Sequence, residues 1–189
     1  MNWEEISALS TFATLLVIAA SAIAAVIQLR HMRSSNTIVG FTGFMDRWAS
    51  PAAREIANHV FNGDLERKLE DPAYRQMLRS GRIDPIAHPE IQYLDFWESL
   101  GMLVKLGYFQ EDAVMESGGP VAVRAWQHCM PLIAILRGVR GPTAYDNFEY
   151  LVSRSILWEE RHPGGIFPSN TPHLPVIDPY PEDPKPNGA

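Results

Sequence analysis

The sequence predicts an all-α protein that has a single N-terminal transmembrane helix, a compact helical bundle and a Pro-rich extended tail. Residues 6–29 contain no Asp, Glu, Lys or Arg. After this stretch, apolar residues recur at steps of three and four, the period of an amphipathic helix. No stretch alternates apolar and polar residues over six or more positions, as a half-buried strand would.

Composition divides the 189 residues into three parts. Residues 1–33 form the predicted N-terminal membrane anchor, which ends in a basic stop. Residues 34–162 are numerous enough to bury the core of one helical cytoplasmic domain. Residues 163–189 are rich in proline and poor in large apolar side chains. This composition predicts an extended or disordered tail.

The predicted span covers about residues 6–29 and would be about 36 Å long as a helix, enough to cross a hydrocarbon core of about 30 Å. Basic residues follow it at Arg30, His31 and Arg33, and none precedes it. The expected location is the inner (plasma) membrane. The positive-inside rule predicts that the N-terminus lies outside this membrane and that the C-terminal domain lies in the cytoplasm.

Two other interpretations of the apolar stretch stay open. A cleaved signal peptide is favoured by the small-residue triplets ASA and AIA, but Glu4 and Glu5 stand where such a peptide carries positive charge. The second interpretation is a helix buried in the core of the domain. Apolar stretches of this length without charge are, however, uncommon in small soluble domains.

One face of the predicted span is lined by small side chains at three- and four-residue steps. Such faces allow two helices to approach closely in lipid, so self-association through the span is a hypothesis. The residues are Ser10, Ala13, Thr14, Val17, Ala20, Ser21 and Ala24.

Helix boundaries in the domain are marked by caps, prolines and glycines. Ser50 and Asp71, each followed by proline, predict two helix starts. The central helix, over 89–106, begins at Pro89 and is closed by Gly107. Its wide apolar face indicates packing on more than one side. The face comprises Ile91, Leu94, Trp97, Leu100, Gly101 and Val104, and it is widened by Tyr93, Phe96, Leu103 and Leu106.

Two further core helices follow. A short helix or turn over 111–119 precedes a helix over 120–138, which Pro131 should kink because it removes a backbone hydrogen bond. The last helix is predicted to start at Pro142 and to end at Gly164 and Gly165. Its inner face comprises Tyr145, Phe148, Leu151, Val152, Ser155 and Trp158.

Charge and cysteine content exclude some classes of protein. Residues 30–162 hold 15 Lys and Arg against 17 Asp and Glu, without a basic stripe, which argues against nucleic acid as a partner. A single cysteine, Cys129, excludes an intramolecular disulfide. It lies in an apolar helical stretch and is expected to be a small buried hydrophobe, because neighbouring helix positions such as His128 point elsewhere.

No motif assigns a catalytic residue, a metal ligand or a cofactor. The six histidines show no HExxH spacing, and glycine-rich segments lack the context of a phosphate loop. Asp95 and Glu98 lie three apart on the central helix, where paired carboxylates can perform acid–base chemistry. The prediction is nevertheless structural, with Glu98 paired to Arg124 or Arg154.

Four strings, in order, resemble a known family: LRHMRSSNTI, HPEIQYLDFWESLGMLVKLGYF, VRAWQHCMPLIAILR and GPTAYDNFEYLVSRS. The resemblance covers about residues 25–165. It is to a bacterial domain-of-unknown-function family of small single-pass membrane proteins with an all-helical cytoplasmic domain. It implies this architecture and brings no activity and no functional residues.

Two functional hypotheses follow. The first is a membrane-tethered helical protein-interaction or regulatory module, which contacts the lipid bilayer through the N-terminal helix and binds another protein or a second copy of itself. The alternative is a small-ligand-binding or enzymatic bundle with a pocket near the central helix 89–106. Its candidate lining is Asp95, Trp97, Glu98, Arg124 and Trp126.

Overall fold

A computed structural model describes residues 2–81, 83–177 and 179, and every regular element in that part of the chain is an α-helix. The all-α prediction is therefore confirmed. The helices are α1 (Trp3–Ala49), α2 (Pro51–Phe61), α3 (Asp64–Glu70), α4 (Pro72–Arg79), α5 (Pro89–Lys105), α6 (Glu111–Arg140) and α7 (Asp146–Arg161).

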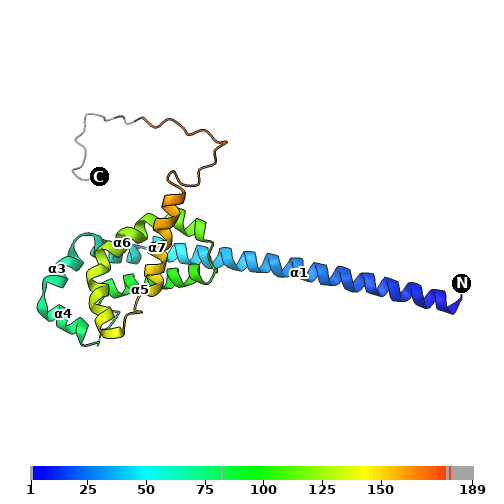
Figure 1. The fold of residues 1–189 in the computed structure, drawn as a ribbon, viewed down its shortest axis with the longest axis horizontal. Coiled ribbons are helices and arrows are strands. Elements are labelled where there is room, and N and C mark those ends of the chain that lie inside the picture. Colours follow the sequence, from blue (N-terminus) through cyan, green and yellow to red (C-terminus); the bar gives the residue numbers. More distant parts are fainter. Residues whose placement is uncertain (1, 82, 178, 180–189) are drawn as a thin grey trace.

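Helix α1 is 47 residues long and projects far beyond the bundle (Figure 1). Its apolar stretch, Ser10–Met32, has a mean hydropathy of 2.3 and no buried residue, so it qualifies as a membrane-span candidate. The helix continues without a break across the predicted boundary at residues 33–34 and through two glycines. Its last turns join the bundle, since Phe41, Phe44 and Trp48 pack against the core.

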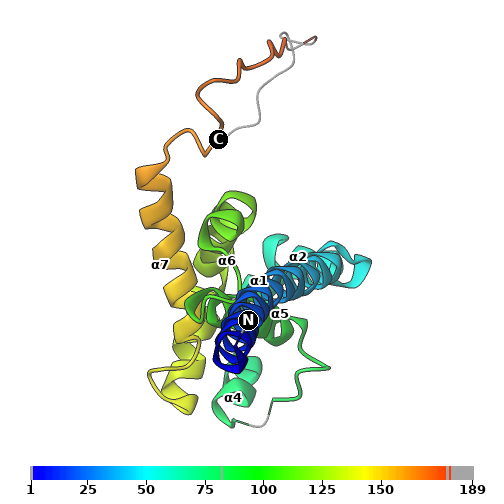
Figure 2. The same cartoon turned by 90° about the vertical axis from the view of Figure 1, so that its right-hand side faces the viewer.

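Helix α5 is the centre of the bundle, as its wide apolar face predicted. The six residues at the centre of that face are buried, and so is Tyr93, while Phe96 and Leu103 are partly buried. Leu106 was wrongly predicted to widen the face: it is 61% exposed, because it caps the C-terminus of the helix and stands in the turn. Gly107, with φ of 71°, follows the helix and allows the chain to reverse. Figure 2 looks along α1 and shows α2 on one side of the α1–α5 layer and α7 on the other.

Helix α6 differs from its prediction, because residues 111–119 belong to the same 30-residue helix as residues 120–138. Val114 and Met115 are buried in the core, which compensates for the poor helix propensity of the following glycines. Pro120 and Pro131 both lie inside this helix. Figure 1 shows α6 crossing the bundle and then changing direction along its length.

Helix α7 begins at Asp146, four residues after Pro142, where its start was predicted. The delay follows from Tyr145, whose φ of 63° is left-handed and cannot continue into a helix from the preceding turn. The predicted inner face is correct, since all six of its residues are buried.

Helices α2, α3 and α4 form the end of the bundle opposite the projecting part of α1 (Figure 1). The sequence did not predict α3, which follows a left-handed Gly63 with φ of 81°. After His162 the described part of the tail contains no helix, and Leu174, Val176 and Ile177 are exposed. The prediction for residues 178 and 180–189 lies outside the described residues.

Candidate functional site

The most concentrated group of ionisable side chains surrounds Glu90, in the first turn of α5. Its side chain is fully buried, with 0% exposure. A buried carboxylate is costly unless it is hydrogen-bonded and paired. Its position at a helix N-terminus is favourable, because the free amide groups and the helix dipole stabilise negative charge there.

Four side chains, from α2, α3, α4 and the residue before α5, contact the two carboxylate oxygens. The Tyr74 hydroxyl donates a hydrogen bond to Oε1, and His88 Nδ1 lies 3.1 Å from the same oxygen. Lys68 Nζ donates to Oε2 over 3.2 Å, and His59 Nε2 lies 3.3 Å from it. We call these five residues the Glu90 cluster. It links α2, α3 and α4 to the start of α5.

The environment keeps the Glu90 carboxylate ionised. Burial raises the pKa of Glu90, but hydrogen bonds from Tyr74, the backbone and Lys68 together outweigh burial and leave its pKa below the ordinary value. Burial, with the adjacent carboxylate, raises the pKa of Tyr74 strongly, so its hydroxyl stays protonated and donates. Both carboxylate oxygens have protein partners, which indicates a structural tie between helices and not an acid or base open to a substrate.

No pattern in the sequence predicts this cluster. Glu90 reads as an ordinary first-turn glutamate, and its partners Tyr74 and Lys68 lie 16 and 22 residues away on other helices. Among the described residues, no group of three or more His, Cys, Asp or Glu side chains is placed to hold a metal ion.

Glu98 does not pair with an arginine, which corrects the prediction. Its carboxylate accepts hydrogen bonds from the backbone N–H of Phe148 over 2.9 Å and from the Asn147 side-chain amide over 2.8 Å. It therefore caps the first turn of α7 from the neighbouring helix. Arg154 instead forms a two-pronged ion pair with Glu111.

The other predicted pocket residues are dispersed. Trp97 is buried in the core and stacks on Phe148 with ring centroids 5.7 Å apart. The Arg124 guanidinium lies 5.2 Å from the centre of the Phe61 ring. The Trp126 ring packs against the same Phe148 ring at right angles, with centroids 5.1 Å apart. The structure does not bring the five predicted side chains into one pocket.

Asp95 lies apart from Glu98's contacts and accepts a hydrogen bond from the Tyr145 hydroxyl over 3.3 Å. Burial raises the pKa of Asp95, against the opposing effects of Tyr145 and Arg140. It also lines a groove of about 570 Å³ beside α5, together with Arg47, Trp48 and Phe96. Asp95 is the only one of the five predicted residues that lines this groove.

Cys129 is fully buried, as predicted. Burial raises its pKa to about 12, so the thiolate needed for nucleophilic chemistry is not formed near neutral pH. The adjacent His128 points to α3, where its Nδ1 lies 2.8 Å from Glu66.

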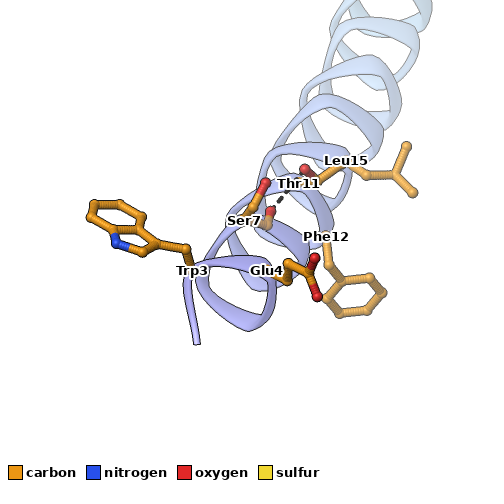
Figure 3. Close-up of a pocket in the computed structure, with 6 residues that line it drawn as sticks. All are labelled: Trp3, Glu4, Ser7, Thr11, Phe12 and Leu15. Atoms are coloured by element: carbon orange, nitrogen blue, oxygen red, sulfur yellow. Dashed lines mark hydrogen bonds between the residues drawn. The ribbon is translucent and has the colours of Figure 1, made fainter. Parts of the chain in front are cut away.

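The second candidate site is the N-terminal half of α1, whose side chains are exposed along the apolar stretch. Figure 3 shows the first turns, where Trp3, Phe12 and Leu15 project away from the helix in different directions and face no other element. The hollow that these side chains surround is open space beside a single helix. The Thr11 and Thr14 hydroxyls donate to the carbonyls of Ser7 and Ser10 over 2.9 Å and 2.8 Å. These polar groups are thus satisfied inside the helix.

Comparison with known proteins agrees with the resemblance seen in the sequence. A family model described as a domain of unknown function (DUF4760) matches residues 15–155. The match starts inside the apolar stretch of α1 and ends in α7, so it includes both the projecting helix and the bundle. No curated protein and no solved structure matches the chain. The chain therefore belongs to this family of domains of unknown function.

Proposed function

We propose that this chain is a single-pass inner-membrane protein whose helix α1 tethers a cytoplasmic protein-interaction or regulatory bundle. One observation carries the proposal. The apolar stretch Ser10–Met32 has no buried residue, and it lies on the same unbroken helix as Phe41 and Trp48, which pack against the bundle core.

The exposed surface of this stretch requires an apolar environment. Its large side chains are more than half exposed along every side of the helix, including Phe12, Leu15, Leu16, Val17, Ile18 and Ile23. Soluble monomers rarely expose an apolar surface of this extent. A helix satisfies its own backbone polar groups, so hydrocarbon can surround it. The hydroxyls of Thr11 and Thr14 donate to carbonyls of their own helix, so they too can lie in hydrocarbon.

Two observations favour an anchor over a cleaved signal peptide. The helix enters the bundle without a turn or loop at which cleavage would release the domain cleanly. The family match begins at residue 15, so most of the apolar stretch Ser10–Met32 belongs to the unit that the family shares. Removable leader sequences are processing segments and lie outside the folded unit.

The bundle itself favours an interaction role. The carboxylates of Glu90 and Glu98 are engaged with other side chains and with a helix end, respectively. An active site instead needs ionisable groups that converge on open space. A tether confines the bundle to the membrane surface and raises its effective concentration towards partners there. Self-association through the small-residue face of the span is part of this proposal.

Membrane fractionation tests the tether. The full-length protein is expected in the membrane pellet after washing with alkaline carbonate, at the intact mass of the uncleaved chain. The variant Leu16→Arg/Ile18→Arg should move a large share into the soluble fraction, because arginine near the centre of a span costs about 3 kcal/mol each. Recovery of the wild-type chain in the supernatant would refute the proposal. A truncated mass would favour the signal peptide.

Cysteine accessibility tests the orientation. Asn2→Cys and Ser169→Cys place thiols at exposed positions on either side of the span. A membrane-impermeant maleimide added to intact spheroplasts should label position 2 and leave position 169 unlabelled until the cells are lysed. The reverse pattern would overturn the proposed topology. The buried Cys129 provides the unlabelled background.

A further inference from the structure

The turn between α5 and α6 lies at the end of the bundle from which α1 emerges (Figure 1). Gly107 reverses the chain with φ of 71°. The residues on either side of it, Leu106 and Tyr108, are each 61% exposed. An apolar residue and an amphipathic aromatic residue therefore stand exposed at this edge of the bundle.

Phe109 fixes the turn against α1. Its side chain is buried, and its ring meets the edges of Phe41 and Phe44 with centroid distances of 5.4 Å and 5.7 Å. A Cβ atom on Gly40 would lie 3.9 Å from the same ring. The turn is thus packed rigidly on the helix that carries the apolar stretch.

The turn and the end of the apolar stretch face the same groove. Its volume is about 810 Å³, and it is lined from α1 by Leu29 and Met32 and from the turn by Gly107 and Tyr108. Helix geometry places Phe41 about 14 Å beyond Met32 along the axis. The lining of the groove runs along α1 from Leu29 to Arg47. The groove therefore begins where the hydrocarbon would end and the headgroup layer would start.

We propose that Leu106 and Tyr108 insert into the phospholipid headgroup layer of the membrane that α1 crosses, and so form a second contact between the bundle and the bilayer. This inference rests on the proposed function. Tyrosine favours the interface because one end of its ring is apolar and the other polar. Two fixed contacts, the span and the turn, would set the tilt and rotation of the bundle.

The charges around the turn fit an anionic lipid surface. Arg47 lines the groove. Lys105 precedes the turn, but its ammonium is engaged with α7, where it donates to Asn147 over 3.3 Å. The two acidic residues that follow the turn are paired with residues of α7. Glu111 forms an ion pair with Arg154, and Asp112 accepts a hydrogen bond from the Trp158 indole. Of these two basic residues, Arg47 can therefore meet a lipid phosphate, at about 1 kcal/mol.

The test measures the depth of labels in the full-length protein, reconstituted in vesicles of equal parts phosphatidylcholine and phosphatidylglycerol. A fluorophore is attached separately at Leu106→Cys, Tyr108→Cys, Leu16→Cys and Ala87→Cys, and nitroxide lipids quench it. Position 16 reports the span. Position 87 lies before α5, at its far end, and serves as the distant control on the same bundle. Cys129 is buried and stays unlabelled.

Quenching at positions 106 and 108 should exceed that at position 87 several-fold, and headgroup-attached nitroxides should act more strongly than those deep in the acyl chain. If the label at position 16 is quenched, but the labels at 106 and 108 are quenched no more than the label at 87, the inference is overturned and the proposed tether stands. A label at 108 that is shielded from water but not quenched by lipid would indicate a protein partner there and also overturn it. Absence of quenching at position 16 would refute the proposed function itself.

Discussion

The backbone carbonyl of Asn147 lies directly against Gly101. A Cβ atom built on Gly101 would stand 2.0 Å from the Asn147 oxygen and 2.5 Å from its carbonyl carbon. One turn earlier on α5, Glu98 accepts the Phe148 amide. The close approach and the cap together fix the start of α7 on α5. The pair of Glu98 and Gly101 is therefore the sequence feature that sets this helix crossing.

Gly101→Ala should destabilise the bundle. The methyl group would collide with backbone, which cannot rotate away as a side chain can. Overpacking costs about 1–3 kcal/mol, and a backbone clash belongs at the upper end. The better helix propensity of alanine recovers only about 1 kcal/mol. Thermal unfolding followed by tryptophan fluorescence should show a lower Tm than that of the wild type.

Gly138→Ala is the matched control for this variant. Gly138 also lies inside a helix, but a Cβ atom there meets nothing within 4 Å. It should leave the Tm unchanged or raise it, because alanine is the better helix former. Equal effects of the two substitutions would contradict the close α5–α7 contact.

Glu98→Ala should weaken the start of α7. Its loss leaves the Phe148 amide, which is buried with the core, without an acceptor. The expected cost is about 2 kcal/mol, as for the loss of a charged cap. Glu116→Ala, at an exposed glutamate of α6, should be nearly neutral. Hydrogen exchange should be faster at residues 147–149 in Glu98→Ala alone, and protection unchanged there would argue against the cap.

Local sequence patterns predicted the buried faces of α5 and α7, because the apolar residues that recur along a single helix are the ones that it buries. The six residues predicted for the inner face of the last helix are all buried, although Tyr145 precedes α7. Boundaries were less predictable, since they depend on tertiary packing. Gly118 and Gly119 read as a break in α6, but Gly119 allows Ser155 of α7 to approach, with a Cβ atom only 3.4 Å from that side chain.

Polar partners were the least predictable part of the site. Glu98 was expected to find an arginine, because a sequence shows charges but not which backbone amides lie nearby. The Glu90 cluster joins residues from positions 59 to 90 on four elements. No helical period relates such residues, so only the folded arrangement identifies them. A tertiary contact of this kind leaves no local signal.

Glu90→Gln should lower stability markedly. The amide keeps the size of the side chain but removes the charge that Tyr74, Lys68 and the two histidines surround. Breaking a buried ion pair from one side costs about 3–5 kcal/mol, and the partial exposure of Lys68 favours the lower value. Chemical denaturation of the bundle measures the difference.

Tyr74→Phe should cost about 2 kcal/mol, because it removes a single donor to a buried carboxylate. Tyr150→Phe, at a half-buried tyrosine on α7, provides the control and should change the stability little. If Tyr74→Phe and Tyr150→Phe behave alike, the hydroxyl of Tyr74 does not support Glu90.

The contribution of Glu90 should depend on pH. Because the fold lowers its pKa from 4.5, the ionised form stabilises the native state above the unfolded pKa, and this stabilisation is lost as pH falls through the lowered value. The difference in unfolding free energy between the wild type and Glu90→Gln should therefore be full at neutral pH and shrink below about pH 4.5. A difference that grew on acidification would contradict the sign of this shift.

The Cys129 thiol should be inert in the folded protein and reactive after unfolding. It is fully buried, and burial raises its pKa to about 12, so both access and thiolate formation are suppressed. With a disulfide reagent at mildly alkaline pH, the wild-type chain should release no chromophore until denaturant is added, and then one equivalent. Ser169→Cys, whose added thiol lies on the exposed tail, should react at once with one equivalent and gain the second on unfolding. Rapid reaction of the native wild-type thiol would mean that α6 opens at Cys129, and its packing in the core would then be weaker than the burial of this residue indicates.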